Sequence, residues 1–342
     1  MAHDEQQPEG DGLMSIIDRL DQVQSLNGRL TAIAPIPTSV KLETTTLCNH
    51  DCSYCSRQYR DRKHGIMSWS FYTRILDEMK EAGVKQVGLF FLGEPFLIKN
   101  LDAWVAIAKQ KGFFTFITTN GTALNAGRIR SVMAAGLDSL KFSCNYYDEQ
   151  QFSELARVSP KLFGRIEQNI KSAREIRDSG YQCELSASSI MYSGEQKEKM
   201  QAYMERISQW VDVTYWNPFY SMSMYADEIE GATGYRPHAG NPGRLKYIDG
   251  KWIPTREPIP CWSAWEGHLG MGDWDDELND YRYHLSACCF DGSGKFNMGD
   301  LNGPDGLDFQ SAWNSPEFVK LRQAHLDKKI EGTVCQSCVA YK

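Results

Sequence analysis

The chain has 342 residues, of which 42% are hydrophobic, and 37 basic against 44 acidic residues give a formal net charge of −7. This length is enough for one large domain with a smaller one beside it. The negative balance does not favour a nucleic-acid-binding surface, and no apolar run approaches the roughly 20 residues of a membrane span.

Residues 1–37 are predicted to form a polar tail followed by a short helix. The opening stretch MAHDEQQPEGDGLMS is acidic and lacks the basic segment and apolar core of a signal peptide. We therefore expect a cytoplasmic protein. Disulfides are rare in that compartment, so the ten cysteines are expected to include metal ligands rather than to form a disulfide framework.

The next segment, 38–217, alternates between strand-like and helix-like patterns. Such alternation indicates an α/β fold with a parallel sheet and helices outside it. Six strand–helix units fit an open, partial (β/α)6 barrel better than a complete eight-fold one. The expected strands are 39–45, 85–92, 113–119, 139–144, 183–191 and 211–216, and the expected helices are 68–83, 101–112, 124–136, 161–180 and 195–210.

Beyond the barrel, residues 218–249 are irregular and predict a linker or a lid. Residues 250–342 predict a small α+β unit that contains a β-hairpin, a helix at 315–330 and five cysteines. The acidic stretch GDWDDELND, residues 272–280, is expected to be a solvated surface loop, with insertion toward the active site as the alternative.

A loop after the first predicted strand carries Cys48, Cys52 and Cys55 at CxxxCxxC spacing. A zinc site takes four ligands. His50 is an unsuitable fourth ligand, because its ligation would crowd the ring that this loop closes around the metal. Iron–sulfur clusters require soft thiolates, and three of them leave one iron of a four-iron cluster open to a small molecule. A structural zinc loop is the alternative.

At these cysteines the sequence resembles the radical SAM superfamily. Its cluster motif has an aromatic residue before the last cysteine, which is Tyr54 here, and its Gly-Glu-Pro motif after the second strand matches Gly93, Glu94 and Pro95. The resemblance implies that S-adenosylmethionine (SAM) binds the open iron. One electron would cleave SAM, and the resulting 5′-deoxyadenosyl radical would take a hydrogen atom from the substrate.

The resemblance also implies contacts to SAM from the barrel. Glu94 would accept charge-assisted hydrogen bonds from its ammonium group. In related enzymes a serine on the fourth strand and an arginine some dozen residues later contact SAM, and Ser143 and Arg157 match this placement. Ser188 on the fifth strand is a further candidate. Ordinary polar strand residues are the alternative interpretation of both serines.

The C-terminal cysteines resemble the Twitch domain, a short relative of the SPASM domain of radical SAM enzymes. This implies an auxiliary 4Fe–4S cluster with four thiolate ligands. Cys288-x-x-Asp291 fits the Twitch register before the hairpin turn, which favours Cys288 over Cys289. A zinc ribbon is the alternative. The implied ligands are Cys261, Cys288, Cys335 and Cys338.

These features predict a radical SAM oxidoreductase. Loss of a proton from a substrate radical and of an electron to the auxiliary cluster would complete a two-electron oxidation. The analogy is to inosamine dehydrogenases, which suggests a small-molecule alcohol or aminocyclitol as substrate. The expected partner is a one-electron donor of the flavodoxin or ferredoxin type, with no nucleic acid or membrane.

Two alternatives stay open. The first is oxidation, crosslinking or epimerisation of a peptide, which we weigh lower because about 37 residues before the barrel are too few for a leader-peptide recognition domain. The second is a non-enzyme, an iron–sulfur sensor or a zinc-binding protein. A sensor would bind SAM without cleaving it.

Overall fold

The computed structural model describes residues 30–59, 62–190, 192, 194–217, 245–248, 251–254 and 260–336. The predicted N-terminal helix, most of the predicted linker or lid, and Cys338 lie outside these ranges. Within them, no helix is long and apolar enough to cross a membrane.

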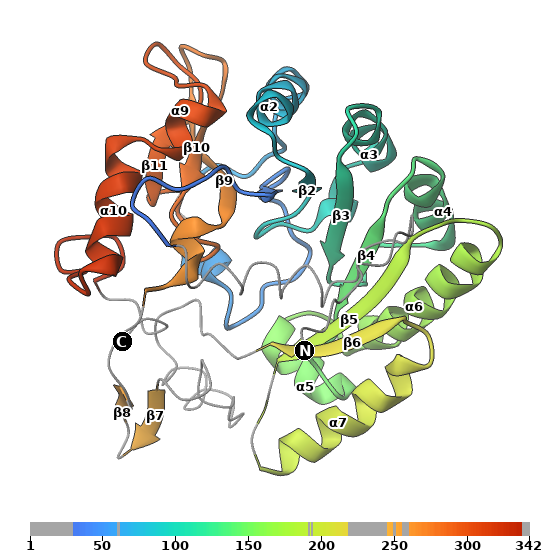
Figure 1. The fold of residues 1–342 in the computed structure, drawn as a ribbon. Helices are drawn as coiled ribbons and strands as arrows, with labels where there is room; N and C mark the ends of the chain where they lie inside the picture. Colours follow the sequence, from blue (N-terminus) through green and yellow to red (C-terminus); the bar gives the residue numbers. More distant parts are fainter. Residues whose placement is uncertain are drawn as a thin grey trace, which may run out of the picture.

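A curved nine-stranded sheet forms the body of the molecule, in the order β11-β10-β9-β1-β2-β3-β4-β5-β6 (Figure 1). The last six strands in this order are parallel neighbours, as the alternating sequence pattern predicts. They are β1 (Ser39–Leu42), β2 (Gln86–Gly88), β3 (Phe114–Thr119), β4 (Ser139–Ser143), β5 (Glu184–Ile190) and β6 (Val213–Asn217).

Helices follow the strands and cover the outer side of the sheet (Figure 1). Five were predicted: α2 (Trp69–Ala82), α3 (Leu101–Gln110), α4 (Ala126–Ala134), α6 (Phe163–Asp178) and α7 (Glu195–Ser208). The sequence analysis missed α5 (Glu149–Ala156), although its start carries a local signal. The Asp148 side chain caps α5 by accepting from the backbone N–H of Gln151.

Side chains on the strands alternate between the helices and the inner face of the sheet. On β4, Leu140 and Phe142 are fully buried in the core under the helices. Lys141 and Ser143 therefore point to the inner face. Because paired residues of parallel strands face the same way, Ser186 of β5, the register partner of Lys141, shares this face.

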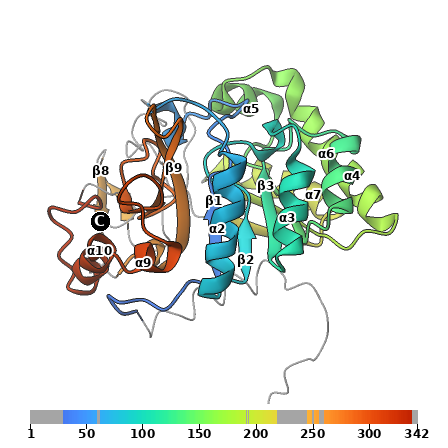
Figure 2. The ribbon, with the colours of Figure 1, turned by 90° about the horizontal axis from the view of Figure 1, so that it is seen from above.

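Three C-terminal strands extend the same sheet beyond β1. Strand β9 (Gly267–Asp275) pairs with β1 in parallel, and β10 (Asp280–Ser286) and β11 (Asn297–Asp300) follow as antiparallel neighbours. The predicted hairpin with a turn at DGSG is confirmed as β10–β11. Figure 2 shows β9 beside β1. Helix α9 (Phe309–Trp313) contacts α2, whereas α10 (Pro316–Leu326) lies farther out and contacts β11. A separate antiparallel pair consists of β7 (Leu245–Ile248) and β8 (Lys251–Pro254).

The acidic stretch at residues 272–280 lies at the surface, as expected, with Asp273, Asp276 and Glu277 exposed, but it is part of a β-hairpin and not an irregular loop. It forms the end of β9, a four-residue turn and the start of β10. The carboxylate of Asp275 accepts from the backbone N–H groups of Glu277 and Leu278, and pairs with Arg282 on β10. The acidic residues thus build a tight turn of their own.

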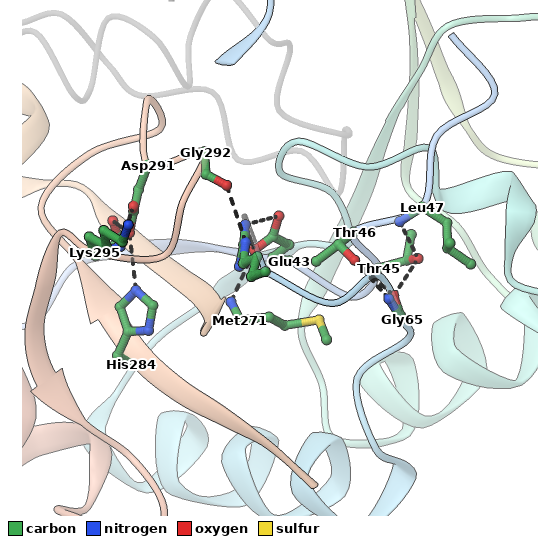
Figure 3. A network of polar contacts seen from close by, with 12 residues as sticks. Glu43, Thr45, Thr46, Leu47, Gly65, Met271, His284, Asp291, Gly292 and Lys295 are labelled. Atoms are coloured by element: carbon green, nitrogen blue, oxygen red, sulfur yellow. Dashed lines mark hydrogen bonds and ion pairs between the residues drawn. The ribbon is translucent and has the colours of Figure 1, made fainter. Parts of the chain in front are cut away.

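A buried ion pair joins the barrel to the C-terminal strands (Figure 3). The guanidinium of Arg62 lies 3.0 Å from the carboxylate of Glu43, at the end of β1, and both side chains are fully buried. Arg62 Nε also donates to the carbonyl of Gly292 at the hairpin tip, at 3.2 Å, and the N–H of Met271 on β9 donates to Glu43. An unpaired buried charge is strongly destabilising, so the Glu43 carboxylate and the Arg62 guanidinium each require the other.

We expect Arg62→Met to lower the free energy of unfolding by about 3 kcal/mol or more, because it leaves the Glu43 carboxylate buried and unpaired. Denaturant unfolding measures this. Lys171→Met, which breaks the surface pair with Glu167 on α6, is the control and should cost about 0.5 kcal/mol or less. Equal effects of the two substitutions would contradict the structural role of the buried pair.

Candidate active site

The cysteine loop leaves the end of β1 and is held from two sides. Cys48, Cys52 and Cys55 are half-buried. The backbone N–H groups of Asp51 and Ser53 donate to the last two carbonyls of α5, at 3.0 and 2.8 Å. The loop ends in a 3-10 turn, η2 (Ser56–Tyr59). The unpredicted helix α5 therefore fixes the middle of the loop.

The three thiols lie close enough to influence one another. Burial, with a smaller contribution from neighbouring negative charges that include Cys55, raises the pKa of Cys48 to about 11 and that of Cys52 to about 12. Three thiolates at this place need a positively charged partner, which an iron–sulfur cluster provides. In the described part of the chain, no three His, Cys, Asp or Glu side chains converge as one shared metal ion would require.

Gly93 lets the Gly-Glu-Pro segment pass close to the cysteine loop. A Cβ atom at this position would lie 2.0 Å from the carbonyl oxygen of Thr45, so no larger residue fits without a shift. The N–H of Glu94 donates to the carbonyl of Leu47, next to the first cysteine, at 2.7 Å. Pro95 then begins the 3-10 turn η3 (Pro95–Leu97). The motif thus braces the base of the cysteine loop.

The Glu94 carboxyl group is buried at the end of β3. Its Oε1 accepts from the Phe96 N–H and the Thr119 hydroxyl, and its Oε2 accepts from the Asn120 N–H at 2.7 Å. Burial nevertheless raises its pKa to about 7. A cation beside this carboxyl would favour its charged form. The contact to the SAM ammonium stays a prediction.

A polar cluster missed by the sequence analysis lies beside Cys48. The hydroxyl of Thr122 accepts from Asn49 and contacts His50 Nε2, at 2.9 and 2.8 Å, and donates to Asn120. The Asn120 amide also bonds to Asn49 and reaches Cys48 Sγ at 3.9 Å. Burial lowers the pKa of His50 to about 4, so this ring is neutral and tied to the fold. In the sequence, the only indication of this cluster is that Asn120 follows a predicted strand.

Tyr54 takes part in a second polar group beside the loop. Its hydroxyl lies 2.7 Å from that of Tyr146, which in turn lies 3.2 Å from Cys52 Sγ, and the Asn145 amide donates to Tyr54. Both asparagine and tyrosine follow directly after β4. The aromatic residue of the motif therefore connects the cysteine loop to the end of this strand.

The remaining predicted cofactor contacts lie on β4, on β5 and at the end of α5. Ser143 and Ser188 are register partners on β4 and β5 and share the inner face, and Ser188 is buried. Arg157 ends α5 in the left-handed region, with φ 56°, and its half-exposed guanidinium lies 3.8 Å from Asp51 of the loop. The structure brings all three toward the carboxyl ends of the strands, and their contacts to SAM stay predictions.

The predicted auxiliary cysteines belong to the C-terminal unit, and none of the nine cysteines in the described ranges forms a disulfide. Cys261, Cys288 and Cys335 are half-buried, and Cys338 lies outside the described residues. The Phe290 N–H donates to Cys288 Sγ at 3.4 Å, which repeats the contact of the His50 N–H with Cys48 Sγ at 3.5 Å. In both loops the donor stands two residues after the cysteine.

The neighbouring thiol, that of Cys289, faces a different environment. Burial raises its pKa to about 12, and the charges of Lys41, Glu266 and Cys261 act on it. Lys41 on β1 pairs with Glu266 at 3.1 Å. The two adjacent cysteines therefore have separate surroundings, although the auxiliary ligand set stays a prediction.

Residues 42–207 match the family model of the radical SAM superfamily. The chain is 30% identical over 152 residues to the PqqA peptide cyclase of Granulibacter bethesdensis, a match that covers 44% of this chain and 39% of that protein. The chain thus matches about two fifths of the length of this relative.

Solved structures share the fold at low sequence identity. SuiB of Streptococcus suis, bound to S-adenosylmethionine, superposes with a TM-score of 0.57 and 16% identity, over 95% of this chain and 76% of SuiB. The anSMEcpe structure with bound AdoMet gives a TM-score of 0.53 and 13% identity, over 89% of this chain and 88% of the other.

The parallel half-barrel, the cysteine loop at the end of its first strand and the family match define a radical SAM domain. This domain spans residues 42–207 of the chain. A radical SAM domain implies a 4Fe–4S cluster and SAM as cofactors, and the three clustered thiols and the buried carboxyl of Glu94 fit that pair of groups.

We expect Gly93→Ala to reduce the iron bound after anaerobic reconstitution to less than half that of the wild type, because the new Cβ would collide with Thr45 at the base of the cysteine loop. Gly164→Ala on α6 is the matched control, since a Cβ there meets nothing within 4 Å. Iron per folded chain is the measurement, with circular dichroism to confirm folding. A fully loaded Gly93→Ala protein would refute the bracing role.

Proposed function

We propose that this chain is a radical SAM oxidoreductase in which the C-terminal unit accepts an electron from the oxidised substrate. One observation carries the proposal. The hairpin tip that follows Cys288 packs directly on the cysteine loop, where a Cβ at Gly292 would lie 2.5 Å from the carbonyl of Ser56, the residue after Cys55. The proposed acceptor is therefore built against the proposed radical-generating site.

In this proposal, Cys48, Cys52 and Cys55 hold the SAM-binding 4Fe–4S cluster. Ser143 and Arg157 bind SAM, and the carboxyl group of Glu94, which reaches the end of β3, faces its ammonium. Together, the bound cluster and SAM supply hydrogen-atom abstraction from a substrate held inside the barrel. The strands, with helices packed on their outer side, form the wall that separates this interior from water.

Residues around Asp291 hold the hairpin tip in place. The Asp291 carboxylate accepts from the Ser286 hydroxyl and the Lys295 N–H, at 2.9 and 2.8 Å, and lies 3.1 Å from His284 Nε2 (Figure 3). Asp291 thereby orients the strand end that carries Cys288. In the proposal, Cys288 and the cysteines at 261, 335 and 338 hold the auxiliary 4Fe–4S cluster.

For the substrate, a peptide is favoured over a small molecule by one specific observation. The relative that matches at 30% identity is a peptide cyclase. SuiB and anSMEcpe, which share the fold, have also been solved with a precursor peptide and with the Cp18Cys peptide, respectively. Oxidation of a peptide side chain is thus our leading substrate class, and an aminocyclitol or other alcohol is the second.

Iron and sulfide counts test the cofactor assignment. Wild-type protein should bind about eight irons per chain, and the combined Cys48→Ala, Cys52→Ala and Cys55→Ala variant about four. Reduced wild type should convert SAM to 5′-deoxyadenosine, and the triple variant should not. Cys183→Ala, in a buried position on the barrel, is the control and should keep all irons. Zinc or no metal in the triple variant would refute the auxiliary cluster.

The adjacent cysteines give a separate test of the auxiliary ligands. We expect Cys288→Ala to lose about four irons and Cys289→Ala to lose none, because the amide-to-sulfur contact is made at Cys288. Electron paramagnetic resonance of the reduced proteins would show which cluster signal disappears. The opposite pattern would assign the ligand to Cys289.

A further inference from the structure

Lys141 places a positive charge on the inner face of the barrel. Its half-buried side chain lies between two aromatic rings, with the ammonium 5.9 Å from the ring centre of Phe90 and 5.7 Å from that of Tyr215. Within the described ranges, this ammonium has no carboxylate partner and no hydrogen bond. By contrast, Lys41, which lies on the inner face of the sheet on β1, is paired with Glu266.

A second unpartnered group lies beside it. Ser186 on β5 is fully buried, and its hydroxyl has no hydrogen-bond partner in the described part of the chain. It is the register partner of Lys141, so both side chains leave the sheet on the same face of neighbouring strands. A buried hydroxyl without a partner is costly. An ammonium and a hydroxyl on one face are two donors suited to an anion.

The position of this pair relates it to the proposed reaction. Ser143 is two residues after Lys141 on the same face of β4, so Lys141 stands roughly 7 Å deeper along the strand than the proposed SAM contact. Tyr215 lies near Lys141 and, across the curved sheet, is close enough to Lys41 to act on the pKa of that lysine. The pair therefore lies in the barrel interior, where the proposed substrate would be held.

We infer that Lys141 and Ser186 bind a carboxylate group of the substrate, held between the rings of Phe90 and Tyr215. The inference rests on the proposed function, because it places the substrate in the barrel. One ammonium and one hydroxyl match a singly charged carboxylate, and the flanking rings exclude water and strengthen the pairing. In a peptide substrate, this group is the side chain of an acidic residue.

The test uses the full chain, reconstituted without oxygen and loaded with SAM. Calorimetric titration compares N-acetyl-glutamate N-methylamide with its uncharged isostere, N-acetyl-glutamine N-methylamide. Wild type should prefer the glutamate probe roughly 10- to 100-fold. Lys141→Gln should abolish the preference, and Ser186→Ala should weaken it by about fivefold. Lys85→Gln, which removes the same charge from an exposed position, is the control and should keep it.

Three results would overturn the inference. The first is a wild type that does not distinguish the two probes, including one that binds neither. The second is a Lys141→Gln variant that keeps the preference. The third is a Lys141→Gln variant whose affinity for SAM falls tenfold or more, because the carboxylate at Lys141 would then be that of SAM.

Failure of the inference is distinguishable from failure of the proposed function. Probe binding is measured without turnover, whereas the proposed function is measured by iron content and 5′-deoxyadenosine. A protein that discriminates the probes and forms no 5′-deoxyadenosine would refute the function and retain the carboxylate site. Normal SAM cleavage by a protein that does not discriminate the probes would refute the carboxylate site and retain the proposed function.

Discussion

The buried pair of Glu43 and Arg62 is the interaction on which the arrangement of this molecule depends. Glu43 extends β1, Arg62 lies on the segment that leaves the cysteine loop, and the carbonyl of Gly292 completes the group from the hairpin tip. One charge pair thus fixes three segments that are remote in sequence. Because a buried charge tolerates little displacement from its partner, the two cysteine-bearing regions are held in one relative position.

Close backbone approach supplies the second constraint. At Gly93 the chain passes the cysteine loop, at Gly292 the hairpin tip passes η2, and at Gly267 β9 passes β1, and in each case a Cβ would come within 3 Å of its neighbour. Between these close contacts, side-chain hydrogen bonds connect the same segments. The cysteine loop is consequently positioned by backbone packing on one side and by α5 on the other.

The sequence predicted the parts of this structure that depend on local patterns. The six parallel strands follow from alternating apolar segments, and the three-cysteine loop and Gly93-Glu94-Pro95 follow from spacing and position after strands. The pairing of β9 with β1 could not be predicted this way. Its glycines break the apolar pattern, and its buried apolar side chains, Leu269 and Met271, are too few to give a strand signal alone.

The polar groups of the site could not be predicted from local sequence patterns either. His50 and Thr122 are far apart in sequence and meet only because the loop after β3 folds back on the cysteine loop. Lys141 is one charged residue on β4, and its surroundings come from β5, β6 and the segment that follows β2. Such groups depend on the curvature of the sheet, which no local pattern specifies.

The pairing of β1 with β9 also has a consequence for biosynthesis. Lys41 and Glu266, which meet at this seam, are 225 positions apart, so β1 has an unpaired edge until most of the chain has left the ribosome. At 5–20 residues per second, that interval lasts on the order of ten seconds or more. An exposed strand edge is prone to pairing with other chains. Nascent chains therefore pass through a period in which chaperone protection matters most. The hairpin tip can pack on the cysteine loop only after Gly292 has left the ribosome.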